Sequence, residues 1–391
     1  MAHLPLVDLK RLHEPLAREL GDAFARVLAS GSYHLGPETE AFEAEFARHE
    51  GGGEGICCGS GSDALFLALR ALDIGPGHAV VTVSNSFMAT PESIVRTGAE
   101  VIFCDVGEAS RTLDPADLAQ ILEEPGAEGI KAVIPIHLYG RRADVAGIDA
   151  VLQAAGRQDI KLIGDAAQAH GSPGVSQDTT LTCYSFYPAK NLGALGDGGF
   201  VIAQNSRHAA RIRGLRNHGR AGKHSVSEIG LNSRFDEIQA AALRIKLKHL
   251  DEWNQQRRDL ADAYRERLGR HDGAGALRLP ADAPNHVHHL FVVQVTVGAD
   301  STVRDRVFAD LRDKHQIGAG LHYPIACHQM PPYPTSRALP VTEHLTDHVL
   351  SLPLFPGMTL DEVDRVAGAL EICLDLRAPG TRITTPRGAR L

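Results

Sequence analysis

The sequence predicts an α/β protein with a large domain on a mostly parallel central sheet and a smaller α+β domain. Over the first half of the chain, short apolar runs typical of strands alternate with segments of helical periodicity. The 391 residues, 43% of them hydrophobic, are enough for two sizeable cores. A long charged helical segment then leads to a shorter mixture of strands and helices. We therefore expect a large domain at 1–250, a small domain at 251–378 and a flexible tail at 379–391.

The elements of the large domain follow from apolar periodicity and from the glycines, prolines and capping residues between the periodic segments. Helical patterns cover 4–30 and 36–50. A strand at 56–58, a glycine turn and a helix at 64–72 come next. The remaining predicted elements are strands 79–83, 101–104, 132–136, 160–163, 181–186 and 200–203, and helices 115–123, 144–155 and 208–217.

The small domain is expected to follow a long helix that opens near residue 231 and continues through Trp253 toward Leu268. The elements predicted beyond it are strands 288–297 and 352–355, and helices 301–315, 342–350 and 360–376.

Composition excludes several classes of protein. A formal charge of −8 without a basic cluster argues against nucleic acid as a partner. No segment approaches the roughly 20 apolar residues of a membrane span, and the N-terminus lacks a signal-peptide pattern. The six cysteines are scattered, with Cys57 and Cys58 expected on opposite faces of one strand, so we expect reduced core residues in a cytoplasmic protein. The histidines at 286, 288 and 289 have no acid or cysteine nearby, which argues against a metal site.

The turn Gly59–Ser62 between a strand and a helix is typical of an anion-binding site. Free backbone N–H groups and the helix dipole both favour a phosphate there. Gly59, Gly61 and Ala64 also fit the G-x-G-x-x-A dinucleotide pattern. That pattern needs an acid about 20 residues on, whereas the first acid after the next strand is Glu92. A single phosphate is therefore favoured, and a dinucleotide stays the weaker alternative.

Phe87, Asp165 and Ser185 fall at the carboxyl ends of predicted strands, where ligands bind in such sheets. Lys190 follows in a glycine-spaced loop with almost no other charge. A lysine kept from water loses its proton more readily, and its neutral amine can form a Schiff base with a carbonyl. Taken singly, Lys190 also fits a solvated surface charge, Asp165 a helix N-cap and Phe87 a core residue.

Together these features match the requirements of pyridoxal phosphate. A lysine forms a Schiff base with its aldehyde, and a carboxylate keeps the pyridine nitrogen protonated. An aromatic side chain stacks on the ring, and a helix N-terminus holds the phosphate. We therefore expect pyridoxal 5′-phosphate as the cofactor, with pyridoxamine 5′-phosphate as its intermediate form.

Several long motifs then identify a family. In order they are Gly61-Ser-Asp-Ala-Leu, Leu69-Arg-Ala-Leu-Asp-Ile-Gly-Pro-Gly, Gly164-Asp-Ala-Ala-Gln-Ala-His-Gly, Ser185-Phe-Tyr-Pro-Ala-Lys-Asn-Leu-Gly with Gly198-Gly199, Arg216-Asn-His-Gly-Arg, Asn232-Ser-Arg-Phe-Asp-Glu-Ile-Gln-Ala and His322-Tyr-Pro. Over nearly its whole length the sequence resembles the nucleotide-sugar aminotransferases of the DegT/DnrJ/EryC1/StrS family. These are fold-type I pyridoxal-phosphate enzymes of the aspartate aminotransferase superfamily, so the resemblance implies their two-domain fold.

The resemblance also implies a role for each matching residue. Lys190 would form the Schiff base with the cofactor, and Asp165 would pair with the pyridine nitrogen. The other implied cofactor contacts are Gln168 near the ring hydroxyl, Phe87 over the ring face, and Gly61, Ser62 and Ser185 at the phosphate. Asn232 would reach the phosphate from a second subunit, which implies a homodimer with shared active sites. The implied substrate contacts are Tyr187, His322 and Tyr323.

The predicted function is transfer of an amino group from L-glutamate, through the cofactor, to a keto group of a nucleotide-linked deoxysugar. Lys190 would also move the proton in that reaction. Gln168 and its neighbours resemble members that act on 3-keto sugars, which favours a dTDP-3-keto-6-deoxyhexose. Members acting on 4-keto sugars or cyclitol ketones remain alternatives. A sugar dehydratase is less favoured because histidine replaces the lysine there, and a cofactor-free regulator because Lys190, Asp165 and Ser185 are all present.

Overall fold

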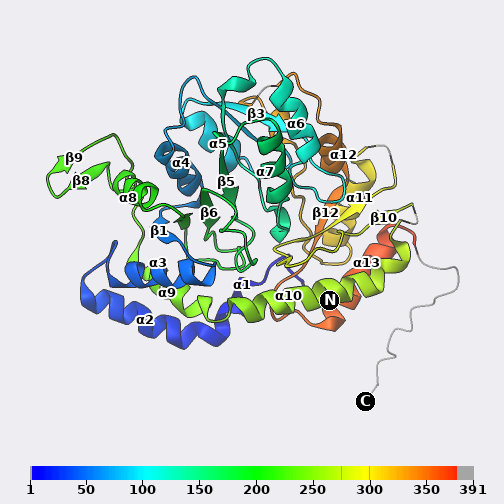
Figure 1. The fold of residues 1–391 in the computed structure, drawn as a ribbon. Helices are drawn as coiled ribbons and strands as arrows, with labels where there is room; N and C mark the ends of the chain where they lie inside the picture. The colour runs from blue at the N-terminus through cyan, green and yellow to red at the C-terminus, as the bar shows by residue number, and fades with distance from the viewer. Residues whose placement is uncertain (1, 274, 299, 334, 377–391) are drawn as a thin grey trace.

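The computed structural model describes residues 2–376 except 274, 299 and 334; the predicted tail at 379–391 lies outside these residues. A seven-stranded sheet forms the centre of the molecule, in the order β1-β7-β6-β5-β4-β2-β3 (Figure 1). Its strands from β3 to β6 pair in parallel, whereas β7 pairs antiparallel with both β6 and β1. The prediction of a mostly parallel sheet is confirmed. The strands are β1 (Glu54–Cys58), β2 (Ala79–Val83), β3 (Glu100–Cys104), β4 (Ile130–Val133), β5 (Lys161–Asp165), β6 (Leu181–Ser185) and β7 (Gly199–Ala203).

Helices cover both faces of this sheet. On one face Cys58 packs with α4 and α8, and on the other Cys57 packs with the aromatic rings of α3. The two cysteines therefore point to opposite faces, as the strand period requires. Figure 1 shows α2 and α3 along the lower side of the molecule. The helices of this part are α1 (Leu9–His13), α2 (Ala17–Ser30), α3 (Pro37–His49), α4 (Gly61–Ala71), α5 (Ala89–Arg96), α6 (Pro115–Glu123), α7 (Val145–Ala154), α8 (Ser206–Leu215) and α9 (Glu237–Leu247).

The C-terminal part of the chain builds a second sheet of three strands, in the order β10-β11-β12. The N-terminal segment joins it, because Leu4 pairs with Ile317 and packs in the same hydrophobic cluster. The domain boundaries drawn from the sequence stay a prediction. The elements of this part are α10 (Leu250–Leu268), β10 (Leu277–Arg278), β11 (Phe291–Val295), α11 (Thr302–Asp313), α12 (Pro340–His348), β12 (Val349–Leu352) and α13 (Leu360–Cys373).

The structure differs from the sequence-based expectation in several elements. The segment predicted as one long helix after residue 231 forms two helices, α9 and α10, with a turn at Lys248 and His249 between them. The turn lets α9 pack on α2 and α3 while α10 packs on α13. Helix α5 was not predicted, because its eight residues are too few for a clear helical periodicity and no side chain caps its first turn. The strand expected at 352–355 lies at Val349–Leu352, where pairing with β11 ends α12 early.

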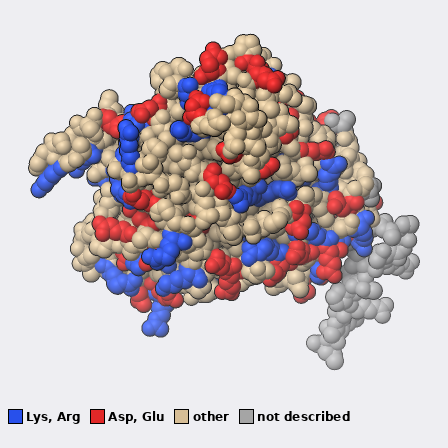
Figure 2. Space-filling model, viewed as in Figure 1, with Lys and Arg blue, Asp and Glu red and all other residues tan. Residues whose placement is uncertain are grey.

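A hairpin of β8 (Arg220–Gly222) and β9 (Ser225–Val226), also not predicted, projects from the body (Figures 1 and 2). Over the rest of the face in Figure 2, basic and acidic side chains are interspersed. Within the described residues, no helix has both the length and the apolar character needed to cross a membrane.

Candidate active site

A cavity of about 560 Å³ opens at the carboxyl ends of the central strands. Its wall combines loops of the large sheet with Leu6 and Val7 from the N-terminal segment and with His322 and Tyr323 from the C-terminal part. Ten of the predicted site residues line it: Gly61, Ser62, Phe87, Asp165, Gln168, Ser185, Tyr187, Lys190, His322 and Tyr323. Asn232 is not among the lining residues and lies in a segment that bridges to Asn217.

Lys190 lies in the loop that follows β6. Its backbone N–H donates to the Tyr187 carbonyl at 2.8 Å, and Ala194 N–H donates back to the Phe186 carbonyl at 2.8 Å, so the loop closes on itself. Burial lowers the pKa of Lys190 to about 8, although the Asp165 carboxylate opposes the shift. A much larger fraction of this amine is therefore neutral near pH 7 than for a lysine in water.

Asp165 ends β5 and is 6% exposed. Its carboxylate accepts hydrogen bonds from Thr90 Oγ1 at 2.7 Å and from the Ala167 N–H at 3.1 Å. Burial raises the pKa of Asp165, while these two hydrogen bonds and the charge of Lys190 oppose the rise. No helix begins at Asp165, so the N-cap interpretation does not hold. Thr90 was missed in the sequence because it lies on the unpredicted helix α5.

The N-terminus of α4 faces the same cavity. Ser60 caps the helix by accepting from the Asp63 N–H at 3.1 Å, and the first-turn N–H groups of Gly61 and Ser62 have no carbonyl one turn back to pair with. A Cβ on Gly61 would lie 2.6 Å from the Ser185 Cβ, so only glycine lets the helix end approach β6 this closely. Gly61, Ser62 and Ser185 therefore line the same cavity, and free helix N–H groups beside serine hydroxyls suit a phosphate.

Gln168 is held in one orientation. Its Oε1 accepts from the Tyr139 N–H at 2.6 Å and its Nε2 donates to the Tyr323 hydroxyl at 3.1 Å. The Tyr323 ring lies 6.3 Å from that of Phe87, which is 53% exposed at the cavity mouth. His322 is fixed by a 2.8 Å hydrogen bond between its Nδ1 and Ser351 Oγ. This part of the wall is therefore pre-organised by contacts between the two parts of the chain.

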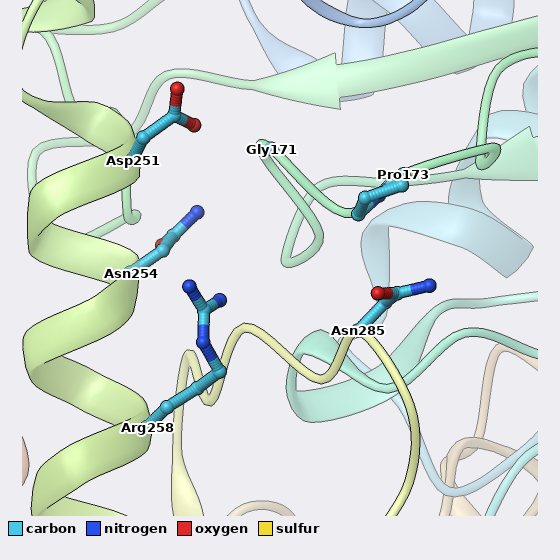
Figure 3. Close-up of a pocket in the computed structure, with 6 residues that line it drawn as sticks. All are labelled: Gly171, Pro173, Asp251, Asn254, Arg258 and Asn285. Carbon is cyan, nitrogen blue, oxygen red and sulfur yellow. The ribbon is translucent and has the colours of Figure 1, made fainter.

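Other candidate sites are less well supplied with functional groups. Among the residues that the structure describes, no group of three histidines, cysteines or acids could hold a metal ion. A second pocket of about 370 Å³ lies between α10 and the loop of Gly171 and Pro173 (Figure 3). The side chains of Asp251 and Arg258, which carry opposite charges, both line this pocket. None of the residues predicted for the site from the sequence lines it.

The residues of the larger cavity fit pyridoxal phosphate. The first turn of α4 and Ser185 line this cavity together, and the half-buried Lys190 and the buried Asp165 line it as well. Fold and site together define a pyridoxal-phosphate-dependent aminotransferase of fold type I. A model of the DegT/DnrJ/EryC1/StrS aminotransferase family matches residues 16–371, and this chain belongs to that family.

Individual relatives agree with this assignment. The chain is 40% identical over 377 residues, 94% of this chain and 95% of the relative, to a dTDP-3-amino-3,4,6-trideoxy-alpha-D-glucose transaminase of Streptomyces venezuelae. The crystal structure of S. venezuelae DesV in complex with a ketimine intermediate superposes with a TM-score of 0.86, at 39% identity, covering 95% of this chain and 98% of that one. NtdA of Bacillus subtilis with bound cofactor PMP gives a TM-score of 0.88, at 29% identity, covering 96% and 86%.

Proposed function

We propose that this aminotransferase moves the amino group of L-glutamate to the keto carbon of a nucleotide-linked 3-keto-6-deoxyhexose, with dTDP as the nucleotide. The observation that supports the substrate class best is the similarity over almost the full chain to the S. venezuelae transaminase. Relatives at 39% and 36% identity are named for UDP-N-acetyl-3-dehydro-alpha-D-glucosamine and for dTDP-3-amino-3,6-dideoxy-alpha-D-galactopyranose. In all three names the amino group belongs on carbon 3 of a nucleotide-linked sugar.

Bound pyridoxal phosphate supplies an electron sink that stabilises negative charge on the carbon being deprotonated. The Lys190 Nζ would supply the neutral amine that holds the cofactor, and as a base and acid it would move the proton at that carbon. The Asp165 carboxylate, oriented by Thr90, holds the proton on the pyridine nitrogen. The first turn of α4 with Ser185 binds the phosphate, and the Gln168–Tyr323 pair orients the ring.

The same proposal includes a homodimer in which Asn232 serves the site of the partner subunit. Its support is geometric: Asn232 lies outside the cavity of its own chain, on the same segment as the projecting hairpin. Mixing Lys190→Ala with Asn232→Ala chains tests this. A mixed dimer contains one site with both residues intact, so activity should reappear on mixing. If the mixture stays as inactive as its parents, Asn232 acts within its own chain; if the Asn232→Ala parent is fully active by itself, Asn232 has no role. We place the reaction in the cytoplasm because the six cysteines, all within the described chain, are free and buried.

Substrate choice is tested by incubating the purified protein with L-glutamate and a panel of ketones. The panel contains dTDP- and UDP-linked 3-keto and 4-keto sugars and a cyclitol ketone, and amination is followed by mass spectrometry. We expect the dTDP-linked 3-keto sugar to give the highest kcat/KM, and preference for another panel member would replace it. Two relatives are named as a sensory transduction protein and a pleiotropic regulatory protein. A protein that stays colourless with pyridoxal phosphate would favour such a role.

A further inference from the structure

His289 lines the cavity but has no part in the reaction described above. It precedes β11 and is 8% exposed. Its two histidine neighbours, His286 and His288, stack on each other with ring centroids 3.7 Å apart and do not line this cavity. Of the three histidines that the sequence placed at this strand, His289 alone reaches the candidate active site.

A chain of hydrogen bonds fixes which ring nitrogen of His289 carries the proton. Asn254 Nδ2 donates to the His170 carbonyl at 2.9 Å, so Asn254 Oδ1 is an acceptor. Asn191 Nδ2 donates to this oxygen at 2.8 Å and to the Val287 carbonyl at 3.0 Å. Backbone carbonyls only accept, so both amide orientations are determined. Asn191 Oδ1 must therefore accept from His289 Nδ1, 3.1 Å away, and the hydrogen is on Nδ1.

With the hydrogen on Nδ1, His289 Nε2 carries a lone pair and can accept a hydrogen bond. Burial, and after it the positive charges of Lys190 and Arg257, hold the pKa of His289 well below its usual range, so the ring is neutral. Among the described residues, Nε2 makes no hydrogen bond and is not one of the fully buried unpaired atoms. Since Nδ1 faces Asn191, Nε2 is the ring nitrogen open to the cavity.

The position of the ring is also constrained through its backbone. The buried Arg257 guanidinium donates to the carbonyls of His288 and His289 at 3.3 and 3.4 Å. A Cβ on Gly140 would lie 2.9 Å from the backbone nitrogen of His289, so the chain here is closely packed. The hydrogen-bond chain that starts at His289 Nδ1 runs through Asn191 to Asn254 on α10. Figure 3 shows Asn254 at the wall of the second pocket. The acceptor is thus held at a fixed point in the cavity.

We propose that His289 is a substrate-binding residue whose Nε2 accepts a hydrogen bond from a donor group of the bound substrate. The donor is either a hydroxyl of the sugar or the ammonium of the amino acid, and both are O–H or N–H groups that match a neutral acceptor. This inference rests on the proposed aminotransferase function. It adds a contact that selects substrates carrying a donor at this point over analogues in which the donor is absent.

Two substitutions separate the cavity-facing nitrogen from the one that holds Asn191. His289→Asn keeps an N–H donor at the Nδ1 position and places nothing at Nε2. His289→Gln places an amide oxygen close to the Nε2 position and leaves Asn191 without its donor. For each protein, the glutamate and keto-sugar half-reactions are followed separately by cofactor absorbance. Binding of a dTDP-linked 3-amino-6-deoxyhexose is measured by calorimetry, and the melting temperature by differential scanning fluorimetry.

We expect His289→Asn to keep the melting temperature of the wild type and to raise KM in one half-reaction about tenfold, the value of one hydrogen bond. His289→Gln should stay within about threefold of the wild type. A rise confined to the keto sugar, with weaker binding in calorimetry, assigns the donor to the sugar. A rise confined to glutamate assigns it to the ammonium.

The opposite ranking, with His289→Gln impaired and His289→Asn unchanged, would overturn the proposal and leave His289 with the single role of orienting Asn191. Equal losses in both variants with a lower melting temperature, or no loss in either, would overturn it as well. The proposed function has its own control. If the wild-type protein shows no absorbance change with L-glutamate, the aminotransferase assignment with that donor fails before His289 is tested.

Discussion

The lowered pKa of Lys190 makes a quantitative prediction about the cofactor-free protein. An amine with a pKa of about 8 instead of 10.5 is neutral in roughly one quarter of molecules at pH 7.5, against about 0.1% for the ordinary value. The neutral amine is the species that attacks electrophiles, so at this pH the fraction of Lys190 in the reactive form should be roughly 200-fold higher than for a lysine with the ordinary pKa.

The assay is pulse labelling with acetic anhydride over a series of pH values. The peptide that contains Lys190 is quantified by mass spectrometry, and the peptide with the exposed Lys223 serves as the reference for reagent decay. Limited access to the cavity lowers all the Lys190 rates together but does not move their midpoint. We expect the labelling rate of Lys190 to rise with pH and level off above a midpoint near 8.

Removing the charge of Asp165 should also shift the pKa of Lys190, in a known direction. The Asp165 carboxylate raises the pKa of Lys190, so Asp165→Asn should move the midpoint to lower pH. Desolvation would be refuted as the dominant cause if the wild-type midpoint lay near 10.5. The proposed coupling between the two side chains would be refuted if Asp165→Asn left the midpoint unchanged or moved it upward.

Three further predictions concern single contacts. Thr90→Val removes a hydrogen bond that lowers the pKa of Asp165, so the acid limb of the pH profile of kcat/KM should move to higher pH. The control is Thr97→Val, which removes a hydrogen bond to the Ile94 carbonyl and should leave the profile in place. Gly61→Ala adds a Cβ 2.6 Å from Ser185 and should weaken pyridoxal phosphate binding about tenfold in a spectroscopic titration. Gly21→Ala, whose added Cβ has nothing within 4 Å, should bind the cofactor like the wild type. Equal affinities of the two variants for the cofactor would contradict the close packing of α4 on β6. Glu237→Ala removes a buried carboxylate that accepts from the N–H groups of Gly36, Glu38 and Thr39 at the start of α3, and should lower the free energy of unfolding in urea by about 3 kcal/mol; an unchanged midpoint would show that water replaces these contacts.

The sequence was most informative where local rules decide the structure. Helix α6 begins and ends where predicted, at Pro115 and Glu123, because Asp114 caps it and proline suits its first turn. Strand β2 also has the predicted bounds, since its five residues are all buried. By contrast, the turn at Lys248 between α9 and α10 contains no glycine or proline, and it follows from which neighbours each helix packs against.

The candidate site divides in the same way. Lys190, Asp165 and the glycine turn could be found because each lies in a recognisable strand–loop context. Thr90 and His289 could not, because their importance depends on partners far away in the chain, Asp165 for Thr90 and Asn191 for His289. The roles of the cavity residues stay predictions until the variants above are measured.

The pairing of Leu4 with Ile317 has a consequence for biosynthesis. Leu4 N–H donates to the Gln316 carbonyl and Leu4 accepts from the Gly318 N–H, while Leu6 and Val7 form part of the cavity wall. A ribosome makes residue 4 roughly 300 residues before residue 317, since the two pairing partners lie that far apart in the sequence. The segment around Leu4 therefore lacks its pairing partner until residues 316–318 have been made, and the part of the cavity wall that Leu6 and Val7 contribute can form only after that point.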